Sequence, residues 1–163
     1  MDMKMILLDL YLKELGVEPS IDSKEKRIIL QKAVYLGQAA GADLGYRYSW
    51  YINGPYSTEL TRDYYRLFES DESAASSEEF ELQSDFKKCL DAVKPLMRVP
   101  KAFKKGKDCW LELVASLDYA RRVLRKSESD AAAFVGREKP HLADSLDLGL
   151  KALSENPLSK AAR

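Results

Sequence analysis

The stretch from residue 28 to residue 68 has the clearest pattern of hydrophobic and polar positions in the chain. Its first part is apolar around nearly the whole circumference of a helix, which is typical of a helix inside a domain. Two adjacent apolar stripes comprise Ile29, Ala33, Leu36 and Ala40, and Leu30, Val34, Gly37 and Gly41. The glycines lack Cβ atoms and would let another backbone approach closely. The pattern predicts a buried central helix.

An aromatic stretch at residues 46–53 follows this predicted helix. Its alternating positions are Tyr46, Tyr48, Trp50 and Ile52 on one side, and Arg47, Ser49, Tyr51 and Asn53 on the other. Period-two alternation of aromatic residues favours a β-strand. We expect Gly54 and Pro55 to end the strand in a turn, and Ser57 to cap the next helix. The apolar face of that helix comprises Leu60, Tyr64, Leu67 and Phe68.

Helical spacing of apolar residues recurs on both sides of this stretch. It predicts further helices over residues 2–15, 86–97 with a kink at Pro95, 109–126 with Asp108 as its cap, 127–137, and from Pro140 onward. The expected fold is therefore one domain that is mainly α with a small β element. Its expected parts are a core at 1–70, an acidic loop at 71–85, a helical part at 86–155 and a tail at 156–163.

Composition narrows the classes of function. The 163 residues include 26 basic and 26 acidic side chains, so no net field draws the protein to nucleic acid or an anionic membrane. No stretch approaches the about 20 apolar residues of a membrane span, and the first ten residues do not resemble a signal peptide. Cys89 and Cys109 are expected to be reduced thiols, which predicts a cytoplasmic protein.

Residues 69–85 contain seven acidic residues and no basic one. This composition favours an exposed linker. Phe80 and Leu82 alternate with acidic residues, however, so residues 79–83 could instead form a second strand beside residues 48–52. In that case the order helix, strand, helix, strand would give a winged-helix-like layout. The sequence leaves both alternatives open.

A basic run at residues 98–107 follows the next predicted helix, with Phe103 inside it. It could form a nucleic-acid patch, or a basic loop that pairs with the acidic one within the chain or across a homodimer. The neutral net charge and the lack of a base-reading motif favour the second interpretation. The full set of candidate nucleic-acid contacts is Arg62, Arg66, Lys101, Lys104, Lys105 and Lys107.

The sequence contains no recognisable combination of catalytic residues. His141 is the only histidine, and the two cysteines lack the paired spacing of a zinc site. A nucleophile–base pair of Cys89 and His141 has no support from the pattern. Phosphate-binding glycine motifs are absent as well. We therefore expect a non-enzymatic protein without a cofactor or a metal.

Two short motifs resemble the Panacea domain and the related YwgA-like proteins of bacteria and phages. The first is Leu30-Gln31-Lys32-Ala33-Val34-Tyr35, and the second is Trp50-Tyr51-Ile52-Asn53-Gly54-Pro55-Tyr56-Ser57. The resemblance covers about residues 24–68. It implies a winged-helix-like helical domain whose characterised members are antitoxins or adaptors that deliver a toxin to a protease. It also implies that Gly54, Pro55 and Ser57 form a structural turn, braced by Gln31, Lys32 and Tyr35.

The leading hypothesis is thus a protein-binding module, antitoxin-like, that masks a partner protein or presents it for degradation. Aromatic residues on an exposed turn are good anchors, and the expected partner-binding residues are Trp50, Tyr51, Asn53 and Tyr56. One alternative is a winged-helix-like DNA-binding regulator that uses the basic residues named above. Another is a structural subunit of a phage or defence assembly that binds through its C-terminal helices.

Overall fold

The computed structural model describes residues 2–69 and 79–158 of the chain. These residues form a mainly helical structure with one small antiparallel sheet, as the sequence predicts. The α-helices are α1 (Met3–Glu14), α2 (Lys24–Ala39), α3 (Thr58–Glu69), α5 (Ser84–Val93), α6 (Lys107–Arg122), α7 (Glu128–Glu138) and α8 (Leu146–Glu155). The other elements are the strands β1 (Ser49–Tyr51) and β2 (Gly54–Tyr56) and the 3-10 helices η1 (Lys94–Met97) and η2 (Pro140–Ser145).

Side-chain caps and prolines set several helix boundaries. Ser23 Oγ accepts from the backbone N–H of Lys26 at 3.2 Å at the start of α2, and Ser127 Oγ accepts from that of Asp130 at 3.1 Å at the start of α7. The helix changes type near Pro95, where a kink is predicted. The α-helix α5 ends at Val93, and the 3-10 helix η1 begins at Lys94. The prediction that Asp108 caps this helix is wrong, since α6 begins at Lys107 with Gly106 as its N-cap.

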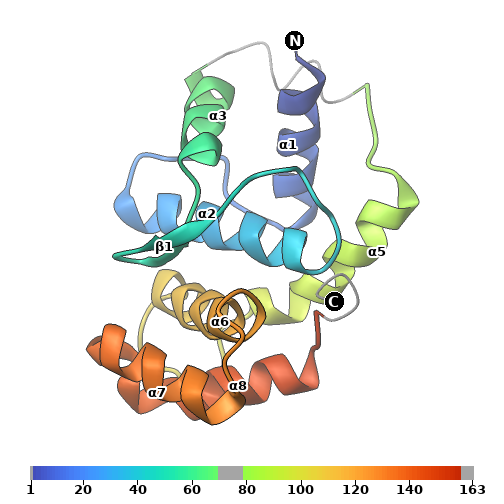
Figure 1. The fold of residues 1–163 in the computed structure, drawn as a ribbon. Helices are drawn as coiled ribbons and strands as arrows, with labels where there is room; N and C mark the ends of the chain where they lie inside the picture. The colour runs from blue at the N-terminus through green and yellow to red at the C-terminus, as the bar shows by residue number, and fades with distance from the viewer. Residues whose placement is uncertain (1, 70–78, 159–163) are drawn as a thin grey trace.

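Helix α2 is the buried centre of the fold. Every residue from Leu30 to Gly37 is buried, which confirms the predicted central helix. Figure 1 shows α2 crossing the middle of the molecule, with α1 and α3 on one side and α6 on the other. The close approach at Gly37 is made by the ring of Tyr11 from α1 and not by a backbone. A Cβ at Gly37 would lie 2.6 Å from Cζ of that ring.

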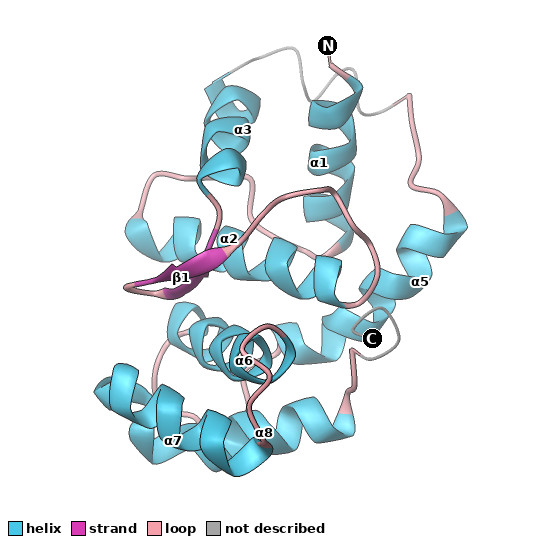
Figure 2. Cartoon of the chain, viewed as in Figure 1, coloured by secondary structure: helices cyan, strands magenta, loops and turns pink. Residues whose placement is uncertain are grey.

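The small sheet is a hairpin, and its turn differs from the one expected. Ser49 pairs with Tyr56, Trp50 with Pro55, and Tyr51 with Gly54. The turn is therefore Ile52-Asn53, whereas Gly54 and Pro55 lie inside β2. Proline is tolerated there because both strands of a two-stranded sheet are edges. Figure 2 shows this hairpin lying against α2.

The second strand expected at residues 79–83 is not formed, which corrects that alternative. Within this segment Phe80 is exposed, and Leu82 is buried against the core in loop conformation. The strands β1 and β2 both precede α3, so the order helix, strand, helix, strand does not arise within the described residues. Residues 71–78 of the expected acidic loop lie outside the described residues. Within the expected tail, Leu158 is buried.

Within the described ranges 2–69 and 79–158, no helix is long and apolar enough to cross a membrane.

Candidate functional site: a hairpin held by buried charges

The hairpin of residues 49–56 presents an apolar tip to solvent. Ile52 is 87% exposed and Tyr51 is 47% exposed, and we call these two residues the hairpin tip. The Tyr51 ring packs edge-on against the Tyr56 ring, with 5.1 Å between the ring centroids. An exposed tyrosine beside an exposed isoleucine is the kind of surface that anchors a protein partner.

Helix α2 holds the second strand of the hairpin through two side chains. The Gln31 amide donates to Ser57 O and accepts from Ser57 N, both at 2.9 Å. Lys32 Nζ donates to Pro55 O at 2.6 Å. Ser57 in turn caps α3, because its Oγ accepts from the N–H of Leu60 at 3.2 Å. Gln31, Lys32 and Ser57 therefore make the contacts that a braced turn requires.

Tyr35 packs its ring edge-on against Tyr48, the residue before β1, with 5.2 Å between the ring centroids, so it contacts the start of the hairpin and not its turn. Its hydroxyl donates to Asp118 Oδ2 on α6 at 2.7 Å. Arg122 Nε and Nη2 donate to the two oxygens of the same carboxylate, each at 2.9 Å. Burial and the neighbouring carboxylate raise the pKa of the Tyr35 hydroxyl, so it stays a donor. Tyr35 thus joins α2 to α6.

A second lysine, from the C-terminal part of the chain, holds the end of strand β1. Lys139, just after α7, donates through Nζ to Tyr51 O at 3.2 Å and to Ile52 O. The same Nζ lies 3.5 Å from Glu112 Oε2 on α6, and both side chains are almost completely buried. Lys32, Glu112 and Lys139 together form what we call the anchor cluster. It fixes backbone carbonyls on both sides of the hairpin turn.

Burial sets the electrostatics of the anchor cluster. It lowers the pKa of Lys32 to about 7, although the nearby Glu112 carboxylate opposes the shift. Burial also lowers the pKa of Lys139, again against the effect of Glu112. A charge in a low-dielectric interior is costly, so both amines lose their protons more readily there than in water. A neutral amine keeps two of the three N–H groups of the ammonium, which is enough for the hydrogen bonds of Lys32 and of Lys139 to the hairpin.

The four expected partner-binding residues do not form one exposed surface. Trp50 is half-buried, with its ring centroid 5.7 Å from that of Tyr119 and 5.1 Å from that of Phe134. Tyr56 and Asn53 are half-buried as well, and the Tyr56 hydroxyl accepts from Thr61 Oγ1 at 2.6 Å. Of the four, only Tyr51 is exposed. The sequence pattern missed Ile52 because it placed this residue in a strand and not in the turn.

The candidate nucleic-acid residues are divided between two regions. Arg62 and Arg66 lie on α3, and Arg66 is 3.9 Å from carboxylate oxygens of both Asp2 and Asp63. Lys101, Lys104 and Lys105 are exposed in the loop before α6, and Lys107 begins that helix. Figure 1 places α3 and α6 on opposite sides of α2.

Phe103, which lies inside the basic run, is a core residue. It is buried, with its ring centroid 5.3 Å from that of Trp110. It is therefore not an exposed ring on which a nucleic-acid base could stack.

Three side chains with metal-binding atoms meet beside Lys139, and sequence analysis did not connect them. They are Cys109 and Glu112 of α6 and His141 of η2, and their ligand atoms lie within 4.8 Å of one another. No local pattern indicates this cluster, because His141 is brought to α6 only by the packing of the C-terminal helices. The cysteine near His141 is thus Cys109 and not the Cys89 considered above.

No protein-family model, curated protein or solved structure matches this chain.

Proposed function

We propose that this chain is a non-enzymatic protein-binding module that contacts its partner through the hairpin tip. The observation that carries the proposal is the combination of an exposed apolar tip, Tyr51 and Ile52, with a backbone held by Lys32 and Lys139. A surface that is fixed before binding loses little conformational entropy on association. Tyrosine adds contact area with few rotatable bonds.

The antitoxin-like role is part of this proposal, and the resemblance to the Panacea domain supports it. In that role the tip would mask a toxin surface or present the toxin for degradation. The braced turn gives the resemblance a physical basis in this chain, because Gln31 and Lys32 of one motif bond to Ser57 and Pro55 of the other.

A DNA-binding regulator has less support. Its candidate residues lie on opposite sides of α2, and Arg66 lies near two carboxylates. Duplex binding also needs a contiguous set of cations that neutralises several phosphates.

The test is purification of the tagged chain from its native host, with its neighbouring genes intact. The proposal predicts one protein that co-elutes in stoichiometric amount, and the antitoxin-like role predicts that this protein is toxic when expressed alone. Nucleic acid that dissociates at raised salt, without a co-eluting protein, would contradict the proposal and favour the regulator.

A further inference from the structure

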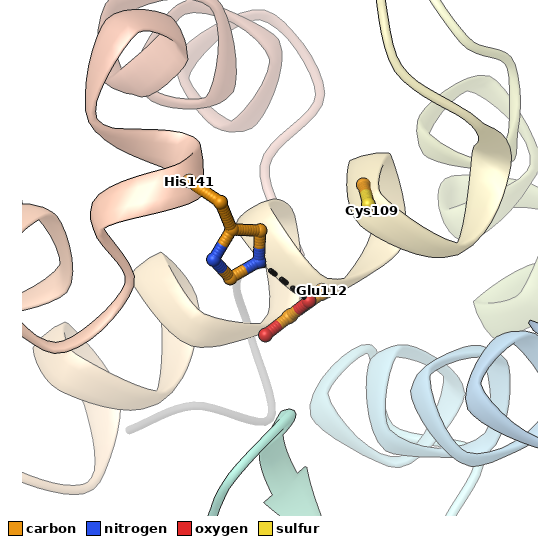
Figure 3. Close-up of side chains that lie close together, drawn as sticks. All are labelled: Cys109, Glu112 and His141. Atoms are coloured by element: carbon orange, nitrogen blue, oxygen red, sulfur yellow. Dashed lines mark hydrogen bonds and ion pairs between the residues drawn. The ribbon is translucent and has the colours of Figure 1, made fainter.

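Cys109, Glu112 and His141 converge on one point between α6 and η2. Cys109 and Glu112 are three residues apart on α6, so their side chains leave the same face of the helix. His141 Nε2 lies 3.2 Å from Glu112 Oε1. Figure 3 shows the imidazole ring directed at the Glu112 carboxylate, with Cys109 about one turn away along the same helix.

We propose that these three residues bind a divalent transition metal of the zinc class. The ligands would be one thiolate sulfur, one carboxylate oxygen and one imidazole nitrogen, with the fourth position open to water or a ligand. Three protein ligands and one open position is a common arrangement for zinc. The site shares Glu112 with the anchor cluster, but the inference does not rest on the proposed protein partner.

The separations suit a tetrahedral ion. Bonds of about 2.0–2.1 Å to nitrogen and oxygen place those two atoms about 3.3 Å apart in a tetrahedron, and the separation of Nε2 from Oε1 is 3.2 Å. A bond of about 2.3 Å to sulfur requires about 3.6 Å from sulfur to each of the other ligands. The ligand atoms of the three residues lie within 4.8 Å of one another, and a rotation of the half-buried Cys109 side chain would have to close the remaining distance.

Glu112 supplies an independent reason for a cation. Its carboxylate is buried, and no donor within residues 2–69 and 79–158 makes a hydrogen bond to Oε2, although Lys139 Nζ lies 3.5 Å away. A buried carboxylate with unused acceptor capacity favours further positive charge. The metal would take Oε1 while Lys139 stays beside Oε2, so the two cations share the carboxylate through different oxygens.

A metal site fits this geometry better than a cysteine nucleophile does. Nε2 of His141 faces Glu112, and the other ring nitrogen points away from Cys109 in Figure 3. Burial raises the pKa of the Cys109 thiol, and Asp108 and Glu112 raise it further. A reactive cysteine needs the opposite environment, whereas a bound metal ion would itself stabilise the thiolate.

The first test is a Co²⁺ titration of the reduced, metal-free full chain, followed by absorption spectroscopy. We expect a thiolate-to-cobalt charge-transfer band together with the d–d bands of tetrahedral cobalt. Cys109→Ser should lose the charge-transfer band. Cys89→Ser is the matched control and should keep it, because Cys89 is also half-buried but lies outside the cluster. Absence of the band in the parent chain, or its persistence in Cys109→Ser, would overturn the proposal.

The second test covers the case in which Cys109→Ser does not fold. The His141 side chain is 43% exposed, so His141→Ala leaves the core intact. We expect at least about a 10-fold loss of Zn²⁺ affinity against a chromophoric competitor, since even outer-shell changes cost that much. Zn²⁺ should also raise the Tm of the parent chain and of Cys89→Ser more than that of His141→Ala. Equal affinities for the parent and His141→Ala would show that His141 is not a ligand.

Discussion

At the scale of single residues, Gly54 has two separate reasons to be glycine. Its φ of +86° lies in the left-handed region that residues with a Cβ rarely adopt. A Cβ at this position would also lie 2.5 Å from Ser116 Oγ, which is buried on α6. The hairpin turn and its contact with α6 therefore depend on the same residue.

We predict that Gly54→Ala lowers the free energy of unfolding by about 2 kcal/mol, through backbone strain plus overpacking. Urea denaturation measures the change. Gly45→Ala is the matched control, because Gly45 has a φ of +85° but open space around its Cβ position. Adding Ser116→Ala to Gly54→Ala should recover the steric part of the loss. Equal losses for Gly45→Ala and Gly54→Ala would contradict the packing argument.

Lys32 should make stability depend on pH. The pKa of its amine falls from the ordinary 10.5 to about 7 on folding, so between these values the unfolded chain binds more protons. The free energy of unfolding then rises with pH from about 7 toward 10, by up to about 1.4 kcal/mol per pH unit. Below pH 7 both states are protonated, and this contribution is at its minimum.

Lys32→Met should reduce this rise and leave a smaller one from Lys139, whose pKa is also lowered. Denaturation at several pH values between about 6 and 9.5 measures the slope. Above that range the buried tyrosines act in the opposite direction, because the unfolded chain ionises first. Lys101→Met, an exposed lysine, is the control and should leave the slope unchanged. A Lys32→Met slope equal to that of the parent would refute the assignment.

At the scale of elements, the hairpin depends on side chains from outside the sheet. A two-stranded hairpin alone is marginally stable in water. Here the hairpin is held by Gln31 and Lys32 of α2 and by Lys139, the residue after α7. The side-chain contacts that hold the hairpin therefore come from elements that are distant from it in sequence.

Lys139→Met should loosen the hairpin while the helices stay folded. It removes the donor to Tyr51 O and Ile52 O and leaves Glu112 without its cation. Hydrogen exchange should show amides of residues 49–56 exchanging about 10-fold faster or more, since an unpaired buried group costs about 1–3 kcal/mol. Lys151→Met on α8 is an exposed control. Unchanged exchange in Lys139→Met would mean that the lysine does not hold the hairpin.

The helices could be predicted from the sequence, but the hairpin register could not. Apolar spacing locates the buried part of α2, because helix formation depends on neighbours three and four residues away. Gly54-Pro55 resembles a turn locally, yet the contacts with Lys32, Ser116 and Lys139 determine where the chain reverses. Lys139 looked like an ordinary charged residue at a helix end, so the anchor cluster was not predicted.

At the scale of the whole molecule, the chain brings residues 32, 112 and 139 together beneath one short hairpin. Helices α2 and α6 pack against each other and against β2. The hairpin therefore lies where these two helices meet. Its tip is left facing solvent. We propose that this tip is a preformed contact surface for a protein partner.

The most direct test of that claim is the Kd for the co-purified partner, measured by calorimetry. The double variant Tyr51→Ala, Ile52→Ser is compared with the parent chain and with the control Tyr65→Ala. Tyr65 is an aromatic residue of α3 that is 38% exposed. Loss of a binding hot spot costs at least about 2 kcal/mol, so the double variant should bind about 30-fold more weakly or worse. Tyr65→Ala should bind like the parent. A tip variant that is folded and keeps the parent Kd would contradict the account.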